Sequence, residues 1–281
     1  MALLESLALG DHICWTVGDG DVRLDSLTAL VEAGLGLGHR VLYCGDDGGE
    51  VFGAFERRGV AAGEAVAAGD LRVAPIGSSY LARGVFDHGA ALGFLRREID
   101  DARRSGYPGL RLISDMSWAG RPVPGAERLP GWEAQANMIF AEGYALGVCA
   151  YDPQAFAAAR LRELARAHPG TAGADAPFDP DSILRMRRTG QPFGMRLEGE
   201  ADLSNAPALS AVIDHLLDSP PGPDATVTIN VDGLRFVDTA AARILLTAAD
   251  RAAGRLRIAG RSPALGRILD VHGKRRTAAA R

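Results

Sequence analysis

The sequence contains few cysteines and no long apolar run, and both deficits restrict the class of protein. Three cysteines among 281 residues form an odd, widely spaced set, which argues against a disulfide scaffold and for a reducing compartment. No stretch approaches the roughly 20 consecutive apolar residues of a membrane-spanning helix. The apolar start 1–9 includes Glu5 and has no basic segment, so it is unlike a signal peptide. We therefore expect a cytoplasmic protein with no membrane partner.

Positive charge is also too sparse and too dispersed for a nucleic-acid-binding surface. The net charge is −4, from 31 basic and 35 acidic side chains, whereas nucleic-acid binding needs a clustered basic face. The short basic segment 274–276 reads more simply as a solvated tail. With 47% hydrophobic and 23% charged residues, we expect an ordinary globular protein that has no nucleic-acid partner.

Motifs for nucleotide hydrolysis and for serine catalysis are missing as well. The loop after the first apolar run, 18–23, has no lysine and no hydroxyl to hold phosphates, and its carboxylates would repel a triphosphate. Asp115 occupies the position of a Walker-B-like aspartate but cannot act alone. No Gly-x-Ser-x-Gly elbow is present. We therefore expect no enzymatic activity and no cofactor.

Short apolar runs and amphipathic helical segments alternate over residues 1–170. Each run ends near Gly or Asp, as strands that lead into loops do, and apolar residues between the runs follow helical spacing. This alternation predicts an α/β unit with a mostly parallel sheet that helices cover. The expected strands are 12–17, 41–44, 71–76, 110–113 and 146–151, and the expected helices include 92–99, 132–144 and 156–167.

A second, smaller α/β unit is expected after a break in the pattern. The interval 171–190 contains Pro177 and Pro180 and predicts a linker. Beyond it, 191–276 has strands that alternate with helices and is long enough for its own core, and 277–281 form a tail. The expected strands are 193–198, 227–231 and 256–259, and the helices are marked by Leu209–Leu217, Ile244–Ala248 and Pro263–Val271.

Three motifs of the second unit together point to one family. Leu197–Asp202 reads LEGEAD, Val231–Asp238 reads VDGLRFVD, and Arg257–Pro263 reads RIAGRSP. In this order they resemble the LxGExD opening, the DLSGLxFxD strand and loop, and the last strand of STAS domains, the module of anti-sigma-factor antagonists. The resemblance implies docking on an anti-sigma factor or on a serine/threonine kinase of the anti-sigma type. It places the docking and phosphoacceptor residues at Asp238, Thr239 and Arg243.

The phosphoacceptor of this family has no direct counterpart in the chain. The usual pattern is Asp-Ser-Ser-Gly with the second serine modified, and here Ala240 stands in that place. Thr239 matches the position that stressosome-type STAS proteins modify, at a helix start where amides and the helix dipole stabilise a phosphate. Thr239 is equally suited to help cap the helix beside Asp238, in which case the domain binds its partner constitutively.

Five segments of the first unit carry a second resemblance: Gly10–Trp15, Gly106–Arg111, Ser114–Trp118, Cys149–Asp152 and His168–Pro169. They are similar to the MEDS sensory domain, a family that includes the sensor of a dichloromethane-responsive regulator. The resemblance covers nearly all of the first 170 residues. It implies a RecA-like α/β fold that senses small hydrocarbon derivatives.

The residues themselves also favour a ligand site at one edge of the expected sheet. In open α/β sheets ligands bind beyond the carboxyl ends of the strands. His12 and Cys14 lie two apart on one strand and so share a face. Aromatic walls with a few polar groups suit a small, largely apolar ligand, although the tryptophans are equally explained as core. The candidate ligand-binding residues are His12, Cys14, Trp15, Asp115, Trp118 and Tyr151.

A metal site is the other chemistry that these residue types permit. His12, Cys14 and Cys149 supply three ligand types, with Cys44 as a fourth. No closely spaced cysteine pair supports such a site, and buried cysteines usually act as small hydrophobic residues. We therefore expect no bound metal and no redox-sensing thiol.

The leading hypothesis is a two-part switch in which a small ligand of the first unit alters docking by the second. Such coupling requires that the ligand favour one arrangement of the units, so we expect a contact between them. Two alternatives remain open. One is a RecA-like nucleotide-binding enzyme, and the other is a scaffold whose pocket is filled by its own side chains.

Overall fold

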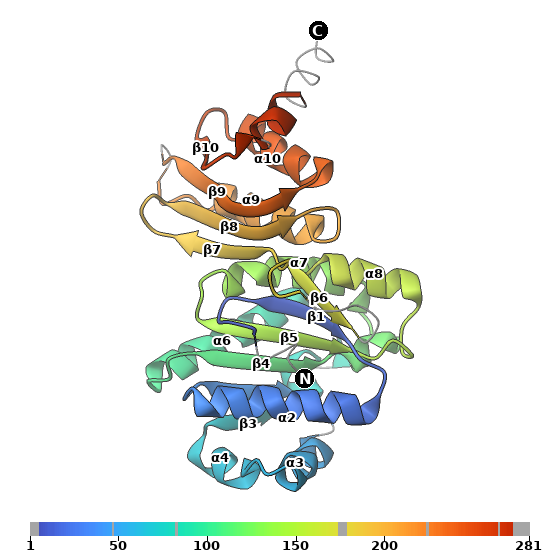
Figure 1. Ribbon diagram of the computed structural model, residues 1–281. Coiled ribbons are helices and arrows are strands. Elements are labelled where there is room, and N and C mark those ends of the chain that lie inside the picture. The colour runs from blue at the N-terminus through green and yellow to red at the C-terminus, as the bar shows by residue number, and fades with distance from the viewer. Residues whose placement is uncertain are drawn as a thin grey trace.

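The computed structural model describes residues 6–46, 48–81, 84–173, 179–222, 225–263 and 265–271. These residues form two α/β units, one stacked upon the other (Figure 1). The expected tail 277–281 and the basic segment 274–276 lie outside the described residues. Among the helices of the described ranges, none is long and apolar enough to cross a membrane.

The first unit contains a six-stranded sheet in the order β3-β2-β4-β5-β1-β6, and every neighbouring pair is parallel. The expected parallel α/β unit is therefore confirmed. Its strands are β1 (His12–Thr16), β2 (Arg40–Cys44), β3 (Leu71–Ala74), β4 (Leu110–Asp115), β5 (Ala145–Tyr151) and β6 (Gly170–Gly173).

Helices cover both faces of this sheet, so each strand carries buried side chains on both sides. On β1, Ile13 and Trp15 pack with α2 and α3, whereas Cys14 packs with α6, α7 and α8. The helices of the first face are α2 (Gly20–Gly36), α3 (Gly48–Arg57) and α4 (Ala62–Ala68); those of the second are α6 (His88–Arg104), α7 (Leu129–Phe140) and α8 (Ala158–Arg166). Short helical segments α5 (Ile76–Ser79), η2 (Ser117–Gly120) and η3 (Ala126–Arg128) complete the unit.

The loop after β1 is arranged as a helix cap. The carboxylate of Asp19 accepts hydrogen bonds from the backbone amides of Asp21 (2.9 Å) and Val22 (3.0 Å) and so caps α2. These are the amides that a phosphate-binding loop would direct at a nucleotide. A carboxylate of the chain itself occupies them here.

The second unit is a four-stranded sheet in the order β10-β9-β8-β7, with helices packed on one face. The strands are parallel except for β7, which forms an antiparallel hairpin with β8. Its elements are β7 (Arg185–Thr189), β8 (Gly194–Ala201), α9 (Ala206–Asp218), β9 (Val227–Val237), α10 (Thr239–Arg251) and β10 (Leu256–Ala259), with further helical residues at 263 and 265–271.

The interval 171–190 is not the linker that we expected. Its first residues belong to β6, which pairs with β1, and residues 185–189 form β7. The strand was missed because three of the five residues of β7 are arginines and only Met186 is fully buried. Both sheets therefore extend into this interval.

The two units make an extensive contact, as the switch hypothesis requires. Asp11, which is 2% exposed, accepts hydrogen bonds from Arg185 (3.1 Å) and Arg187 (2.9 Å) of β7. On the other side, Met138 of α7 and the adjacent Ala141 belong to the hydrophobic core of the second unit. The expected contact between the units is confirmed.

We expect the substitution Asp11→Ala to lower the free energy of unfolding by about 1–3 kcal/mol, because two partly buried arginines lose their acceptor. Chemical denaturation of the full chain measures this loss. Asp181→Ala is the matched control, since it removes an exposed pair with Arg235 and should cost no more than about 0.5 kcal/mol. Equal losses in the two variants would show that Asp11 does not stabilise the contact between the units.

Candidate functional site

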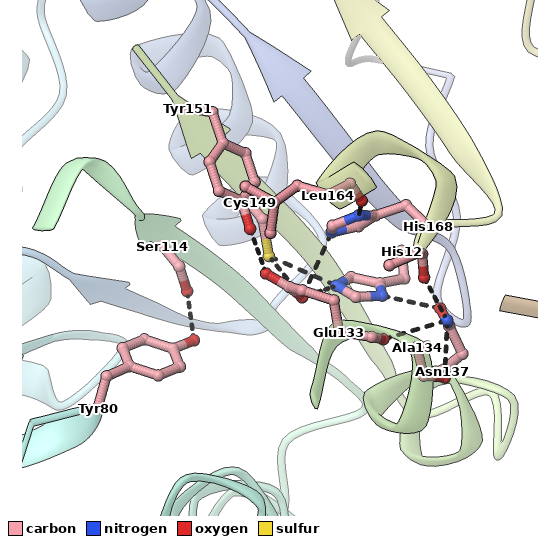
Figure 2. A network of polar contacts seen from close by, with 11 residues as sticks. His12, Tyr80, Ser114, Glu133, Ala134, Asn137, Cys149, Tyr151, Leu164 and His168 are labelled. Carbon is pink, nitrogen blue, oxygen red and sulfur yellow. Dashed lines mark hydrogen bonds and ion pairs between the residues drawn. The ribbon is translucent and has the colours of Figure 1, made fainter. Parts of the chain in front are cut away.

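Four polar side chains meet in the core of the first unit, between the sheet and α7. They are His12 of β1, Glu133 of α7, Cys149 of β5 and His168, which follows α8 (Figure 2). Each is at most 1% exposed. One potential ligand atom from each lies within 4.8 Å of those of the other three. We call these four residues the polar cluster.

The register of the strands and one glycine make room for the polar cluster. His12 pairs with Gly147 of the adjacent strand β5, two residues before Cys149, so both side chains lie on the same face. A Cβ at Gly147 would come within 2.5 Å of the Phe140 ring and 2.8 Å of the His12 ring. Because this Cβ is absent, His12 stacks on Phe140 with ring centroids 4.4 Å apart.

Hydrogen bonds at the rear of each imidazole fix its tautomer. Asn137 places its Nδ2 toward three backbone carbonyls, so its Oδ1 faces His12 Nδ1 at 2.8 Å. His168 Nδ1 lies 2.8 Å from the carbonyl oxygen of Leu164. Since these oxygens only accept, we assign the proton to Nδ1 in both rings. In its neutral form each imidazole then directs the lone pair of Nε2 into the polar cluster.

A single carboxylate oxygen is the meeting point of the polar cluster. Glu133 Oε2 lies 3.4 Å from His12 Nε2, 3.3 Å from His168 Nε2 and 3.6 Å from Cys149 Sγ. The other oxygen, Oε1, accepts a hydrogen bond of 2.5 Å from the hydroxyl of Tyr151. His168 Nε2 is completely buried, and its contact with Glu133 Oε2 does not have the geometry of a hydrogen bond.

Burial and the close neighbours set the charges of the polar cluster. Burial lowers the pKa of His12, and the neighbouring His168 lowers it further. Burial raises the pKa of Glu133, but His168 and His12 more than offset this and hold it below its usual range. Burial and Glu133 raise the pKa of the Cys149 thiol well above its usual value. Without a further cation, Glu133 is therefore the anion of the polar cluster and Cys149 is a neutral thiol.

Aromatic side chains lie next to the polar cluster on the same face of the sheet. Tyr80 stacks on Trp118, with ring centroids 6.1 Å apart, and meets Trp132 edge-on at 5.4 Å. The hydroxyl of Tyr80 bonds Ser114, which pairs in register with Cys149 (Figure 2). The indole N–H groups of Trp118 and Trp132 are buried and have no hydrogen-bond partner. We call Tyr80, Phe86, Trp118 and Trp132 the aromatic cluster.

The structure separates the six residues that we expected to bind a ligand. His12 is in the polar cluster, Tyr151 bonds it, Cys14 shares the face of His12, and Trp118 is in the aromatic cluster. Trp15 is on the opposite face of β1, in the other core, because successive strand residues alternate in direction. Asp115 lies at the end of β4 in an ion pair with Arg23 at 3.1 Å. These two do not join the other four.

The sequence interpretation did not select Glu133, Asn137 and His168, although the sequence contains a signal for the first two. Glu133 and Asn137 are four residues apart on α7, so they share one face of a helix that is otherwise largely apolar. Polar groups at such spacing in a buried helix point to a built polar site. Cys149 was considered as a metal ligand together with His12 and Cys14, with Cys44 as a fourth, and of these three only His12 belongs to the polar cluster.

The expected docking residues of the second unit lie together at the start of α10. Asp238 accepts hydrogen bonds from Ala241 N and from Leu203 N, each at 2.9 Å, so it caps α10 and holds the loop after β8. Thr239 and Arg243 are exposed and, four residues apart, share a helix face. Two large apolar side chains are also exposed here, Leu203 at 57% and Phe236 at 49%. We call Leu203, Phe236, Asp238, Thr239 and Arg243 the docking surface.

Comparison with known protein families finds two matches along the chain. Residues 11–169 match the family described as "MEthanogen/methylotroph, DcmR Sensory domain", or MEDS, and residues 184–275 match the family described as "Mlab, STAS domain". Both resemblances noted in the sequence are confirmed, in the expected order. The second match begins at β7, in agreement with the structure. No curated protein matches the chain. The chain therefore belongs to the MEDS family, and a STAS domain follows its sensory domain.

Proposed function

We propose that the MEDS domain binds a small molecule and thereby controls how the STAS domain docks on an anti-sigma factor or a serine/threonine kinase of the anti-sigma type. The domain pair makes the chain a signalling protein of the anti-sigma-factor-antagonist kind. The observation that carries the rest of the proposal is the position of α7. This helix belongs at once to the polar cluster of the MEDS domain and to the core of the STAS domain.

The two roles of α7 fall on different sides of the helix. Glu133 and Asn137 face the polar cluster, whereas Met138 and the adjacent Ala141 pack into the core of the STAS domain beside α9. A helix in a close-packed interior moves as a rigid element. A ligand that displaces the carboxylate of Glu133 would therefore shift the surface on which α9 rests.

A second connection runs from α8 to the docking surface. His168 of the polar cluster is two residues beyond Arg166, whose Nε donates to the carbonyl oxygen of Leu203 at 3.0 Å. The amide of Leu203 in turn donates to Asp238, the cap of α10. A movement of His168 would therefore reach the docking surface through the side chain of Arg166 and the loop that contains Leu203.

The chemistry of the sensory core favours a small, largely apolar ligand. The aromatic cluster provides apolar side chains, and two of its buried indole N–H groups, those of Trp118 and Trp132, lack hydrogen-bond partners. A buried unpaired polar group costs about 1–3 kcal/mol. A scaffold core that only has to pack has no need of two such groups in one cluster, so they support a ligand-binding role.

Enzymatic nucleotide hydrolysis receives no support from the same fold. Asp19 occupies the amides at the start of α2, and Asp115 is engaged by Arg23 and by the amide of Ser117. Neither the amides that would bind the phosphates nor the aspartate that would assist hydrolysis is therefore available to a nucleotide. Release of inorganic phosphate from ATP by the purified protein would contradict the proposal of a non-catalytic sensor.

The docking surface combines exposed apolar side chains with Thr239, a hydroxyl that phosphorylation would make negatively charged. Leu203 and Phe236 are exposed beside Thr239, at the start of a helix. A phosphate on Thr239 would add a charge of roughly −2 next to the carboxylate of Asp238 and would disfavour an acidic or apolar partner there. We propose that this modification, where it occurs, releases the partner.

Coupling between the domains predicts that a change in the polar cluster alters the STAS domain. In hydrogen–deuterium exchange, Glu133→Gln should raise exchange in α9 and in residues 202–205, because α7 loses its tie to the sheet. Glu127→Gln is the control, since Glu127 is 70% exposed just before α7. Unchanged exchange in α9 of the Glu133 variant would refute the coupling.

Docking by the STAS domain predicts a loss of affinity when its apolar side chains are removed. Phe236→Ser should weaken binding to the anti-sigma factor of the source organism by about tenfold or more, since exposed aromatic side chains often dominate interfaces. Leu37→Ser is the control, because Leu37 is 60% exposed and lies in the MEDS domain. Calorimetric titration of both variants measures the difference, and equal affinities would place docking elsewhere.

Regulation at Thr239 predicts that a negative charge there weakens the same complex. Thr239→Glu should lower the affinity for the anti-sigma factor, whereas Thr239→Ser, which keeps a hydroxyl at the helix start, should preserve it. A Thr239→Glu protein that binds as tightly as the wild type would show that docking is constitutive.

A further inference from the structure

The polar cluster contains the donor atoms of a transition-metal site. Two imidazole nitrogens, one carboxylate oxygen and one sulfur come from His12, His168, Glu133 and Cys149. Zn²⁺ binds all three ligand types, and in closed sites it takes four of them in a tetrahedron. Hard cations such as Mg²⁺ and Ca²⁺ prefer oxygen ligands, so the ligand set favours an ion of the zinc class.

Four of the six separations between these atoms match the edges of such a tetrahedron, and all six are within 4.8 Å. With ordinary Zn–N, Zn–O and Zn–S bond lengths, the edges measure roughly 3.3–3.4 Å between N and O and roughly 3.5–3.6 Å where sulfur takes part. The structure has 3.4 and 3.3 Å from Glu133 Oε2 to the two imidazole Nε2 atoms. Cys149 Sγ lies 3.6 Å from Glu133 Oε2 and 3.4 Å from His12 Nε2. The two N···O distances are long for hydrogen bonds between fully buried groups, and all four distances suit ligands around a common ion.

The orientation of the ligands is also that of a metal site. Both imidazoles carry their proton on Nδ1, held by Asn137 Oδ1 and by the carbonyl of Leu164, so both Nε2 lone pairs point inward. Tyr151 holds the second oxygen of Glu133, which leaves Oε2 for the ion. Such outer partners, which orient each ligand, are the usual surroundings of bound metals. A metal ion would also supply the partner that His168 Nε2 lacks.

Charge balance gives an independent reason for a divalent ion. Isolated charges are costly in a core that water does not reach. One Zn²⁺ with the Glu133 carboxylate, a Cys149 thiolate and two neutral imidazoles has a net charge of zero. A bound metal ion deprotonates its thiol ligand outright. Without an ion, Oε2 and two inward lone pairs would face one another unless an additional proton on one imidazole Nε2 separated them.

We propose that His12, Glu133, Cys149 and His168 bind one divalent ion of the zinc class in tetrahedral geometry. The site differs from the one considered in the sequence, because Glu133 and His168 replace Cys14 and Cys44. All four positions are filled by the protein, as in structural rather than catalytic zinc sites. The ion would join β1, β5, α7 and the end of α8. This inference stands apart from the proposed signalling function and does not depend on it.

The direct test is the metal content of the full chain, purified without chelators or an affinity metal. We expect about one zinc ion per chain by elemental analysis. Removal of the metal with a strong chelator should lower the melting temperature, because an ion that binds only the folded chain stabilises it. A metal-free protein whose melting temperature does not respond to added Zn²⁺ would overturn the proposal.

Cobalt substitution identifies the ligands without relying on variants that fail to fold. Wild-type protein loaded with Co²⁺ should show the intense visible bands of a tetrahedral ion together with thiolate-to-cobalt charge transfer. Cys149→Ser should lose the charge-transfer band, whereas Cys44→Ser, which changes another buried cysteine on the same face, should keep it. Octahedral spectra in the wild type, or charge transfer that survives in Cys149→Ser, would show that the metal binds elsewhere.

Discussion

A carboxylate buried as completely as that of Glu133 is unfavourable by several kcal/mol unless its surroundings offset the loss of water. The MEDS domain provides that offset from three places in the chain: His12 of β1, Cys149 and Tyr151 of β5, and His168 after α8 all turn toward this one group. Because Glu133 belongs to α7, the position of α7 on the sheet depends on the same contacts. The proposed metal ion would strengthen this dependence, since the ligands of an ion are more closely constrained in geometry than the partners of a loose ion pair.

The position of α7 matters beyond the MEDS domain because the STAS domain has no complete core without it. Met138 and Ala141 fill part of that core, and Asp11, the neighbour of His12 in the sequence, holds Arg185 and Arg187 of β7. The polar cluster and the contact between the domains are thus built from adjacent residues of the same segments. A closely packed interface of this kind passes discrete displacements from one domain to the other, whereas a flexible linker would not. The loop after β8 connects this interface to the docking surface, because Leu203 in that loop bonds both Arg166 of α8 and Asp238 at the start of α10.

Local sequence patterns predicted every strand except β6 and β7, the two α/β units, and the face shared by His12 and Cys14, because period-two and helical spacing report burial directly. They did not predict which polar residues meet, since Glu133 and His168 come from a helix and a loop whose approach is decided only by packing across the sheet. Trp15 was included among the candidate ligand-binding residues, but the strict alternation of β1 directs it into the opposite core. The strand β7 was read as linker because an edge strand in which three of five residues are arginines lacks an apolar pattern. In each case the missing information was a long-range contact rather than a local preference.

The affinity of the full chain for its anti-sigma factor, measured with and without a substitution at His168, tests the proposed switch most directly. His168 belongs to the polar cluster and not to the docking surface, and it lies two residues beyond Arg166. If the polar cluster sets the state of the STAS domain, His168→Ala should change this affinity by about fivefold or more, as expected for a coupling free energy between two sites. Cys44→Ser, which leaves the polar cluster intact, should not change it. Equal affinities for wild-type and His168→Ala protein, with both folded, would contradict the claim that the sensory core and the docking surface form one switch.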